Sequence, residues 1–233
     1  HAITIVGWDD NYSKDNFRVA PPGDGAYIVK NSWGPYFGDG GYFYISYYDT
    51  SIFQSGDLKP TFTFVLNESQ RFNRNYQYDI AGVSDSINTY QKDVTYSNEF
   101  TSTTDDFLAA FSTYFLDNVN YEASIYVNNQ LKTTKSGISN VGYQTINLDE
   151  VVPIRKGDVF KVSIRLISSN SISIPVSLYA DFYNYPTANR LTYGSGISYL
   201  KTSIQVKDLY NYYSNIRAVA SIKAFTTTLD SNI

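Results

Sequence analysis

The chain has 233 residues and a net charge of −4, and it contains no cysteine and no methionine. This acidic balance excludes the basic surface typical of nucleic-acid-binding proteins, and no apolar run approaches the roughly 20 residues of a membrane span. A disulfide framework is impossible without cysteine. The 23 tyrosines and 14 phenylalanines favour β structure, because flat rings pack well on pleated sheets.

The first 50 residues predict three strands. Residues 1–8 form an apolar run, and residues 26–32 form a second one. If these two strands pair antiparallel around the loop between them, His1 lies opposite Asn31. A glycine-rich turn at residues 38–41 then precedes a third strand at 42–48. An imidazole that faces a side-chain amide, with the indole of Trp33 next to it, is half of a nucleophilic catalytic site.

These elements resemble the second half of a papain-like (C1 family) cysteine protease. The match is His1-Ala2 before an apolar strand, followed by a strand that enters Lys30-Asn31-Ser32-Trp33-Gly34. The resemblance implies that His1 is the catalytic base and then acid, that Asn31 orients its imidazole, and that Trp33 covers the bond between them. It also implies an N-terminal half of the protease domain that carries the cysteine, whose thiolate an imidazolium would stabilise. We therefore expect the chain to be a fragment or processed piece.

A long polar loop at residues 9–24 departs from the family pattern. Many papain-like relatives have a tight turn here, and we expect this loop to lie near the active-site wall, where it could shape access or bind an ion. Three groups of acidic residues invite a calcium hypothesis: residues 9–11, Asp105 with Asp106, and Asp79 with Asp85. None has the spacing of a known calcium loop, so solvated loop carboxylates are the alternative.

The chain changes character after about residue 60. We assign residues 1–49 to the peptidase part, 50–60 to a linker with breaker residues, and 61–230 to a second domain. That domain shows short alternating runs between turn residues, typical of a β-sandwich or jelly roll. The runs lie at residues 61–66, 94–101, 107–116, 121–127, 143–148, 159–166, 172–179 and 216–225. For residues 107–116 a short helix is the alternative, because the run contains two alanines. We expect a hairpin turn at 127–131 and another turn at 153–158.

The second domain resembles the lectin-like domain that follows the papain-like domain in some microbial cell-surface cysteine proteases. The order Gly142-Tyr143 to Leu148, Val152-Pro153-Ile154 and Gly157-Asp158-Val159-Phe160 carries this resemblance. It implies one possible structural calcium somewhere in residues 61–230, which the sequence does not place. The tyrosine runs at 183–185 and 210–213 could stack on sugars, but such runs are also common in β domains without ligands.

The fold class we predict is mainly β: the strand half of a papain-like α+β domain, followed by a β-sandwich or jelly-roll lectin-like domain. The predicted function is that of a secreted or cell-surface cysteine endopeptidase with a protein substrate, no catalytic cofactor and a possible cell-wall glycan partner. The alternative is a non-catalytic adhesion or carbohydrate-binding protein with a degenerate protease domain. Because three strands cannot bury a core alone, we expect an exposed apolar face around Ile3, Ile5, Ile28 and Val29.

Overall fold

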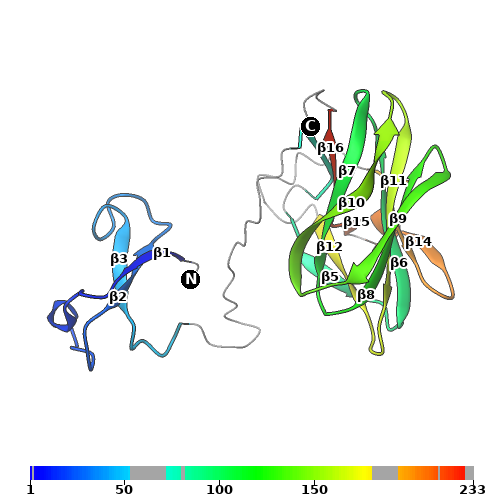
Figure 1. Cartoon of the computed structure of the whole chain (residues 1–233). Helices are drawn as coiled ribbons and strands as arrows, with labels where there is room; N and C mark the ends of the chain where they lie inside the picture. The colour runs from blue at the N-terminus through cyan, green and yellow to red at the C-terminus, as the bar shows by residue number, and fades with distance from the viewer. Residues whose placement is uncertain (2, 53–71, 80–81, 180–193, 215, 229–233) are drawn as a thin grey trace. The chain divides into compact units, whose positions relative to one another are not determined.

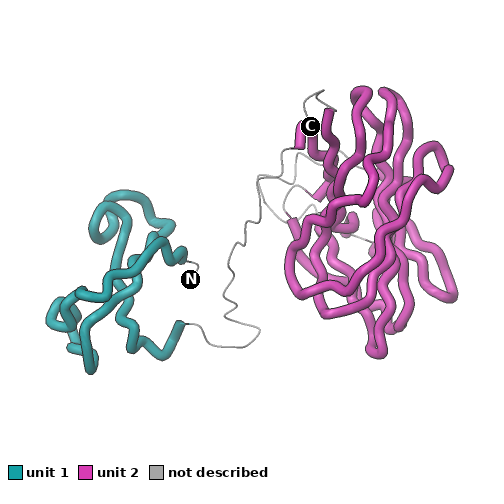
Figure 2. The backbone as a smooth tube through the Cα atoms, viewed as in Figure 1, with its two compact units in different colours: residues 1–68 teal, residues 69–233 magenta. Residues whose placement is uncertain are grey.

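The computed structural model divides the chain into two compact units, residues 1–68 and 69–233 (Figures 1 and 2). It describes residues 1, 3–52, 72–79, 82–179, 194–214 and 216–228. Most of the predicted linker at 50–60 lies outside these residues, as does the strand predicted at 61–66. No helix in the described ranges is long and apolar enough to cross a membrane.

The first unit contains one antiparallel sheet with the strand order β1-β2-β3. Strand β1 (Thr4–Asp9) pairs with β2 (Ala26–Lys30), and β2 pairs with β3 (Tyr42–Ser46). All three strands were predicted, but each is shorter than predicted, and His1 lies before the start of β1. The apolar side chains of Ile5, Val6 and Trp8 on this edge strand are exposed. This agrees with the prediction that three strands alone leave apolar side chains uncovered.

One part of the predicted apolar face is wrong. Val29 is fully buried, and Ile3 and Ile28 are half-buried, so of the four named residues only Ile5 is exposed. The reason is that β2 is the central strand of the sheet, whose neighbours on both sides cover its side chains, whereas β1 is an edge strand.

The second unit is a β-sandwich built from a four-stranded and a six-stranded antiparallel sheet, with a third sheet of three strands. Their orders are β10-β7-β16-β4, β14-β13-β6-β11-β8-β9 and β15-β12-β5 (Figure 1). The described strands are β4 (Arg74–Gln77), β5 (Asp85–Asn88), β6 (Asp93–Thr101), β7 (Asp106–Phe115), β8 (Asn120–Val127), β9 (Gln130–Ile138), β10 (Gly142–Ile154), β11 (Val159–Ile167), β12 (Ser173–Tyr179), β13 (Ser198–Lys201), β14 (Val206–Asp208), β15 (Arg217–Ala220) and β16 (Ile222–Thr227).

The core lies between the two larger sheets and belongs entirely to the second unit. Phe111 on β7 and Phe160 on β11 are fully buried within it. The hydroxyl of Tyr96 on β6 lies 3.0 Å from that of Thr113 on β7, so a buried polar contact joins the two layers. Alternate residues of β8 and β11 enter this core, which is why alternation in the sequence predicted these two strands well.

One strand prediction in this unit is confirmed over its alternative, and two others need correction. Residues 106–115 form a strand and not the alternative helix, because the two alanines lie in a central strand that both neighbours approach closely. Strand β10 continues through Pro153, which was assigned to a turn; β10 is an edge strand, where a residue without an N–H is tolerated. Residues 216–225 form two strands in different sheets, separated at Ser221, rather than one strand.

Candidate functional site

The side chains of His1 and Asn31 meet at one end of the three-stranded sheet. Nε2 of the His1 ring lies 2.8 Å from Oδ1 of Asn31. Asn31 follows directly after β2 and is buried, whereas His1 is exposed. The antiparallel pairing of β1 and β2 brings these residues together, because the start of β1 lies beside the end of β2.

A second hydrogen bond determines the direction of the first. The backbone N–H of Ser32 donates to Oδ1 of Asn31 at 2.8 Å. Because a backbone N–H can only donate, the Asn31 atom that faces both partners must be the amide oxygen, which can only accept. Nε2 of His1 therefore carries a hydrogen whenever this bond is made, and Nδ1 is the nitrogen left to exchange a proton with another group.

The glycine-rich turn fixes the position of Asn31. The backbone N–H of Asn31 donates to the carbonyl oxygen of Gly41 at 3.0 Å. Gly41 has φ = 98°, and a Cβ atom there would lie 3.1 Å from the carbonyl oxygen of Gly34. Only glycine adopts this conformation without strain, so the turn predicted at 38–41 places the residue that binds the imidazole.

An aromatic cluster supports the imidazole from the side. The Trp33 ring packs at 4.9 Å from the His1 ring with a tilt of 36°, and 63% of its surface remains exposed. Phe37 makes an edge contact with Trp33 at 4.9 Å, and Phe43 on β3 contacts Phe37 at 5.9 Å. Trp33 was singled out from the sequence, but Phe37 was missed; its place just before the glycine-rich turn was the available signal.

The long loop at residues 9–24 does not lie near His1. It connects the end of β1 to the start of β2, and therefore sits at the opposite end of a six-residue strand, roughly 20 Å away. There Tyr12 stacks on Tyr44 of β3 at 4.2 Å, and Asp24 accepts a hydrogen bond from the backbone of Lys14 at 2.8 Å. The expectation that this loop shapes the active-site wall is therefore wrong.

The three acidic groups are engaged by protein partners. Asp10 accepts a hydrogen bond from the hydroxyl of Tyr47 at 2.7 Å, and Asp105 accepts one from the backbone of Lys156. The other carboxylates also accept hydrogen bonds: Asp9 from Asn11, Asp85 from Ser86, Asp79 from Lys223, and Asp106 from Arg74, Thr104 and Thr226. In the described ranges no three His, Cys, Asp or Glu side chains converge as a metal site. A structural calcium within residues 61–230 stays a prediction.

The second tyrosine run is occupied by neighbouring cations. The Arg217 guanidinium lies 4.9 Å from the ring centre of Tyr210, and Nζ of Lys207 lies 4.8 Å from that of Tyr212. These rings contact cations of the same chain, and whether they also stack on sugars stays a prediction. The run at 183–185 lies outside the described residues.

Comparison with known families follows the division into two units. The model of the lectin-like domain family matches residues 75–226, about two thirds of the chain. The chain belongs to the lectin-like domain family. The model of the papain family of cysteine proteases matches residues 1–56, so this lectin-like chain carries the C-terminal part of a papain-like protease domain at its N-terminus. Its fold class is mainly β, as predicted.

Two solved structures are similar over nearly the whole chain. One is a Cys-to-Ala variant of the clostridial cysteine protease Cwp84 after propeptide cleavage, with 26% identity and a TM-score of 0.66. The other contains the cysteine protease and lectin-like domains of Cwp84, a surface layer associated protein of Clostridium difficile, with 26% identity and a TM-score of 0.63. Each match covers 98% of this chain, but only 58% and 52% of the respective Cwp84 chain. No curated protein matches the chain.

Proposed function

We propose that this chain carries the C-terminal half of the protease domain of a papain-like cysteine endopeptidase, joined to an accessory lectin-like domain. The observation that supports this proposal is the hydrogen bond from Nε2 of His1 to Oδ1 of Asn31, which leaves Nδ1 for proton transfer. The chain has no cysteine, so the nucleophile would lie in the other part of the protease domain. A degenerate, purely adhesive protein that kept the scaffold would also keep this pair, so the nucleophile decides between the two.

The proposed reaction needs a base that later becomes an acid. His1 Nδ1 would accept the proton of the cysteine thiol, and the thiolate would attack the scissile carbonyl carbon. The imidazolium would then return the proton to the leaving amine, and water would hydrolyse the thioester that remains. Asn31 would hold the ring in one orientation through both steps, and the Trp33 ring would limit access of water to the imidazole.

We also propose that the enzyme is secreted or bound to the cell surface and cleaves a protein substrate there. The support is the similarity to Cwp84, which is described as a surface layer associated protein. On this proposal, the second unit holds the enzyme near its substrate, and the domain limits are the predicted ones, with residues 61–230 as the accessory domain.

The test is covalent labelling of the protein with its complete protease domain by a papain-class epoxide inhibitor. Intact-mass analysis should show one adduct, which peptide mapping should place on a cysteine. His1→Ala should slow labelling by about 10²–10⁴-fold, the range of general acid–base catalysis, and Asn31→Ala should slow it by a smaller factor.

Ser32→Ala is the matched control, because it keeps the backbone N–H that binds Asn31, so its labelling rate should equal that of the parent protein. If a folded protein that contains the cysteine gives no adduct, the peptidase proposal fails and the adhesive alternative becomes the better explanation.

A further inference from the structure

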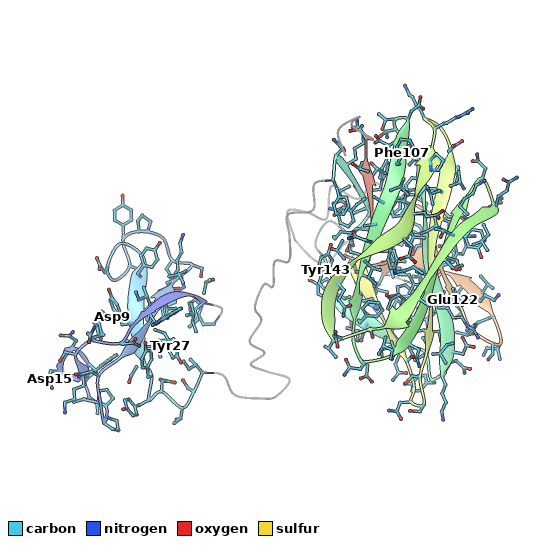
Figure 3. All side chains as sticks on the ribbon, viewed as in Figure 1. Asp9, Asp15, Tyr27, Phe107, Glu122 and Tyr143 are labelled. Atoms are coloured by element: carbon cyan, nitrogen blue, oxygen red, sulfur yellow. The ribbon has the colours of Figure 1, made fainter. Side chains whose placement is uncertain are left out.

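The outer face of the six-stranded sheet contains a polar groove of about 450 Å³. Its lining comes from β6, β8, β11, β13 and β14, so it crosses the strands instead of following one of them. The residues that line it alternate along each strand with residues of the core. Figure 3 labels one of them, Glu122 on β8. Nothing in the proposed peptidase function uses this surface.

Three serines form the floor of the groove. Ser163 on β11 pairs in register with Ser97 on β6 and with Ser124 on β8. Neighbouring strands lie about 4.8 Å apart, so the three hydroxyls form a row with roughly that spacing. Within the described ranges, no hydrogen bond engages any of these three hydroxyls. They are short side chains between two rows of long ones, and this difference in length creates the groove.

Charged and aromatic side chains form one wall. Lys161 pairs in register with Glu99 and with Tyr126, on either side of it. Its Nζ lies 3.7 Å from the Glu99 carboxylate and 4.8 Å from the ring centre of Tyr126. This wall therefore offers a cation, an anion and a ring within one row.

The opposite wall repeats the mixture of charges. Arg165 pairs in register with Glu122 and with Thr95, and Thr95 pairs with Lys201. Nε and Nη2 of Arg165 are bound to the carboxylate of Asp93, at 2.9 and 2.6 Å. This bidentate pair holds the guanidinium in place and leaves the Nη1 donors without a partner among the described residues.

The chemistry of the groove selects one class of ligand. Each wall mixes cations and anions, so neither attracts a polyanion such as a nucleic acid. The exposed lining mixes polar and apolar surface in similar amounts, which disfavours a purely apolar ligand. An extended peptide that adds to a sheet would bind along an edge strand, whereas this groove crosses the central strands.

Sugar hydroxyls can donate to a carboxylate and accept from an ammonium group at the same time. The serine row has a spacing close to the length of one pyranose unit, and the ring face of a tyrosine can pack on the apolar face of a sugar. We propose that this groove binds an uncharged oligosaccharide across strands β6, β11 and β8.

The experiment uses calorimetric titration of the whole 233-residue chain. The probes are three uncharged tetrasaccharides, with β1,4-linked N-acetylglucosamine, β1,4-linked glucose or α1,4-linked glucose units, and a sulfated tetrasaccharide as the anionic comparison. We expect at least one uncharged probe to bind, with an affinity that changes little between about 0.05 and about 0.5 M salt.

Ser163→Phe should fill the groove and weaken binding by at least about tenfold. Thr145→Phe places the same ring on an exposed position of β10 in the other sheet, and should bind like the parent chain. Lys161→Ala should weaken binding by a smaller factor without adding volume, so the proposal is still tested if Ser163→Phe fails to fold.

The proposal is overturned if no uncharged probe binds, if only the sulfated probe binds, or if both Ser163→Phe and Lys161→Ala bind like the parent chain. Because the readout is binding, it is independent of the peptidase proposal, and either proposal can fail alone.

Discussion

Single residues in this chain show both what sequence can predict and what it cannot. His1, Asn31 and Trp33 were found because each lies at the end of a strand or just beyond it, where antiparallel pairing determines which residues meet. The residues of the groove were missed. They occupy outward positions on strands far apart in the sequence, where a polar side chain looks like an ordinary solvated one. Only the register of those strands aligns Ser97, Ser163 and Ser124.

Tyr78 gives a prediction for alkaline pH. Its hydroxyl donates to the backbone oxygen of Glu99 at 2.7 Å, and its ring stacks on Phe100 at 5.0 Å. Burial, with a further contribution from the Glu99 carboxylate, raises the pKa of Tyr78 to about 12. An unfolded tyrosine has a pKa of about 10. Between these values the unfolded chain loses the proton first, so the free energy of unfolding falls as pH rises from about 10 to about 12.

Tyr78→Phe removes this titration. We expect the variant to be less stable by about 1 kcal/mol at neutral pH, because it lacks the hydrogen bond, and to lose less stability than the parent above pH about 10. Urea unfolding at a series of pH values measures both effects. Tyr90→Phe, at a position that is 82% exposed, is the control and should follow the parent chain. Identical slopes for Tyr78→Phe and the parent above pH 10 would contradict the assignment.

At the scale of elements, the strands best predicted are those with one face in the core. Strands β8 and β11 alternate strictly between buried and outward residues, and this pattern is visible in the sequence, whereas β6 buries Tyr96, Ser97 and Asn98 in succession. Strands β13 and β14 were not predicted, because they have only four and three residues and such short runs carry no clear period. The place of β13 is determined by its pairing with β6, and that of β14 by its pairing with β13, which is tertiary information.

The turn between β8 and β9 provides a prediction at this scale. Asn128 and Asn129 connect the paired residues Val127 and Gln130, and both have positive φ, 48° and 64°. Two positive values in a two-residue loop define a type I′ turn, and the hairpin itself was predicted from the sequence. Asn128 also binds the loop after β10, since its Nδ2 donates to Asp158 at 2.8 Å.

Asn129→Val should lower the free energy of unfolding by about 1–2 kcal/mol, because a β-branched residue is strained at positive φ. Asn129→Gly is the matched variant, which should be neutral or slightly stabilising because glycine adopts this conformation freely. Urea denaturation of the three proteins measures the difference. The turn assignment would be wrong if Val and Gly at this position gave equal stability.

At the scale of the whole molecule, the two units differ in how much apolar surface they bury. The core cluster lies wholly within the second unit, whereas in the described part of the first unit only Ala26 and Val29 are buried apolar residues. A unit that buries so little is marginally stable by itself. We therefore expect the backbone amides of β1–β3 to exchange hydrogen much faster than those of β6, β7 and β11.

Hydrogen-exchange mass spectrometry of the 233-residue chain tests this difference. Repeating it on the protein with its complete protease domain is the informative comparison, because the proposed partner half would cover Ile5, Val6 and Trp8 and slow exchange in β1. Equal protection of both units in the 233-residue chain would mean that the first unit is stabilised by something other than buried apolar area.

The alternation along β6, β8 and β11 has an evolutionary consequence. Val94, Val162 and Ile125 maintain the fold, while their sequence neighbours Thr95, Ser163 and Ser124 line the groove. If the groove binds a sugar as proposed, mutations in the two sets are subject to different selection, since one set affects folding and the other affects binding. In such a domain, single substitutions at the outward positions can change the specificity while the protein stays folded. The same separation makes the groove a natural target for directed evolution.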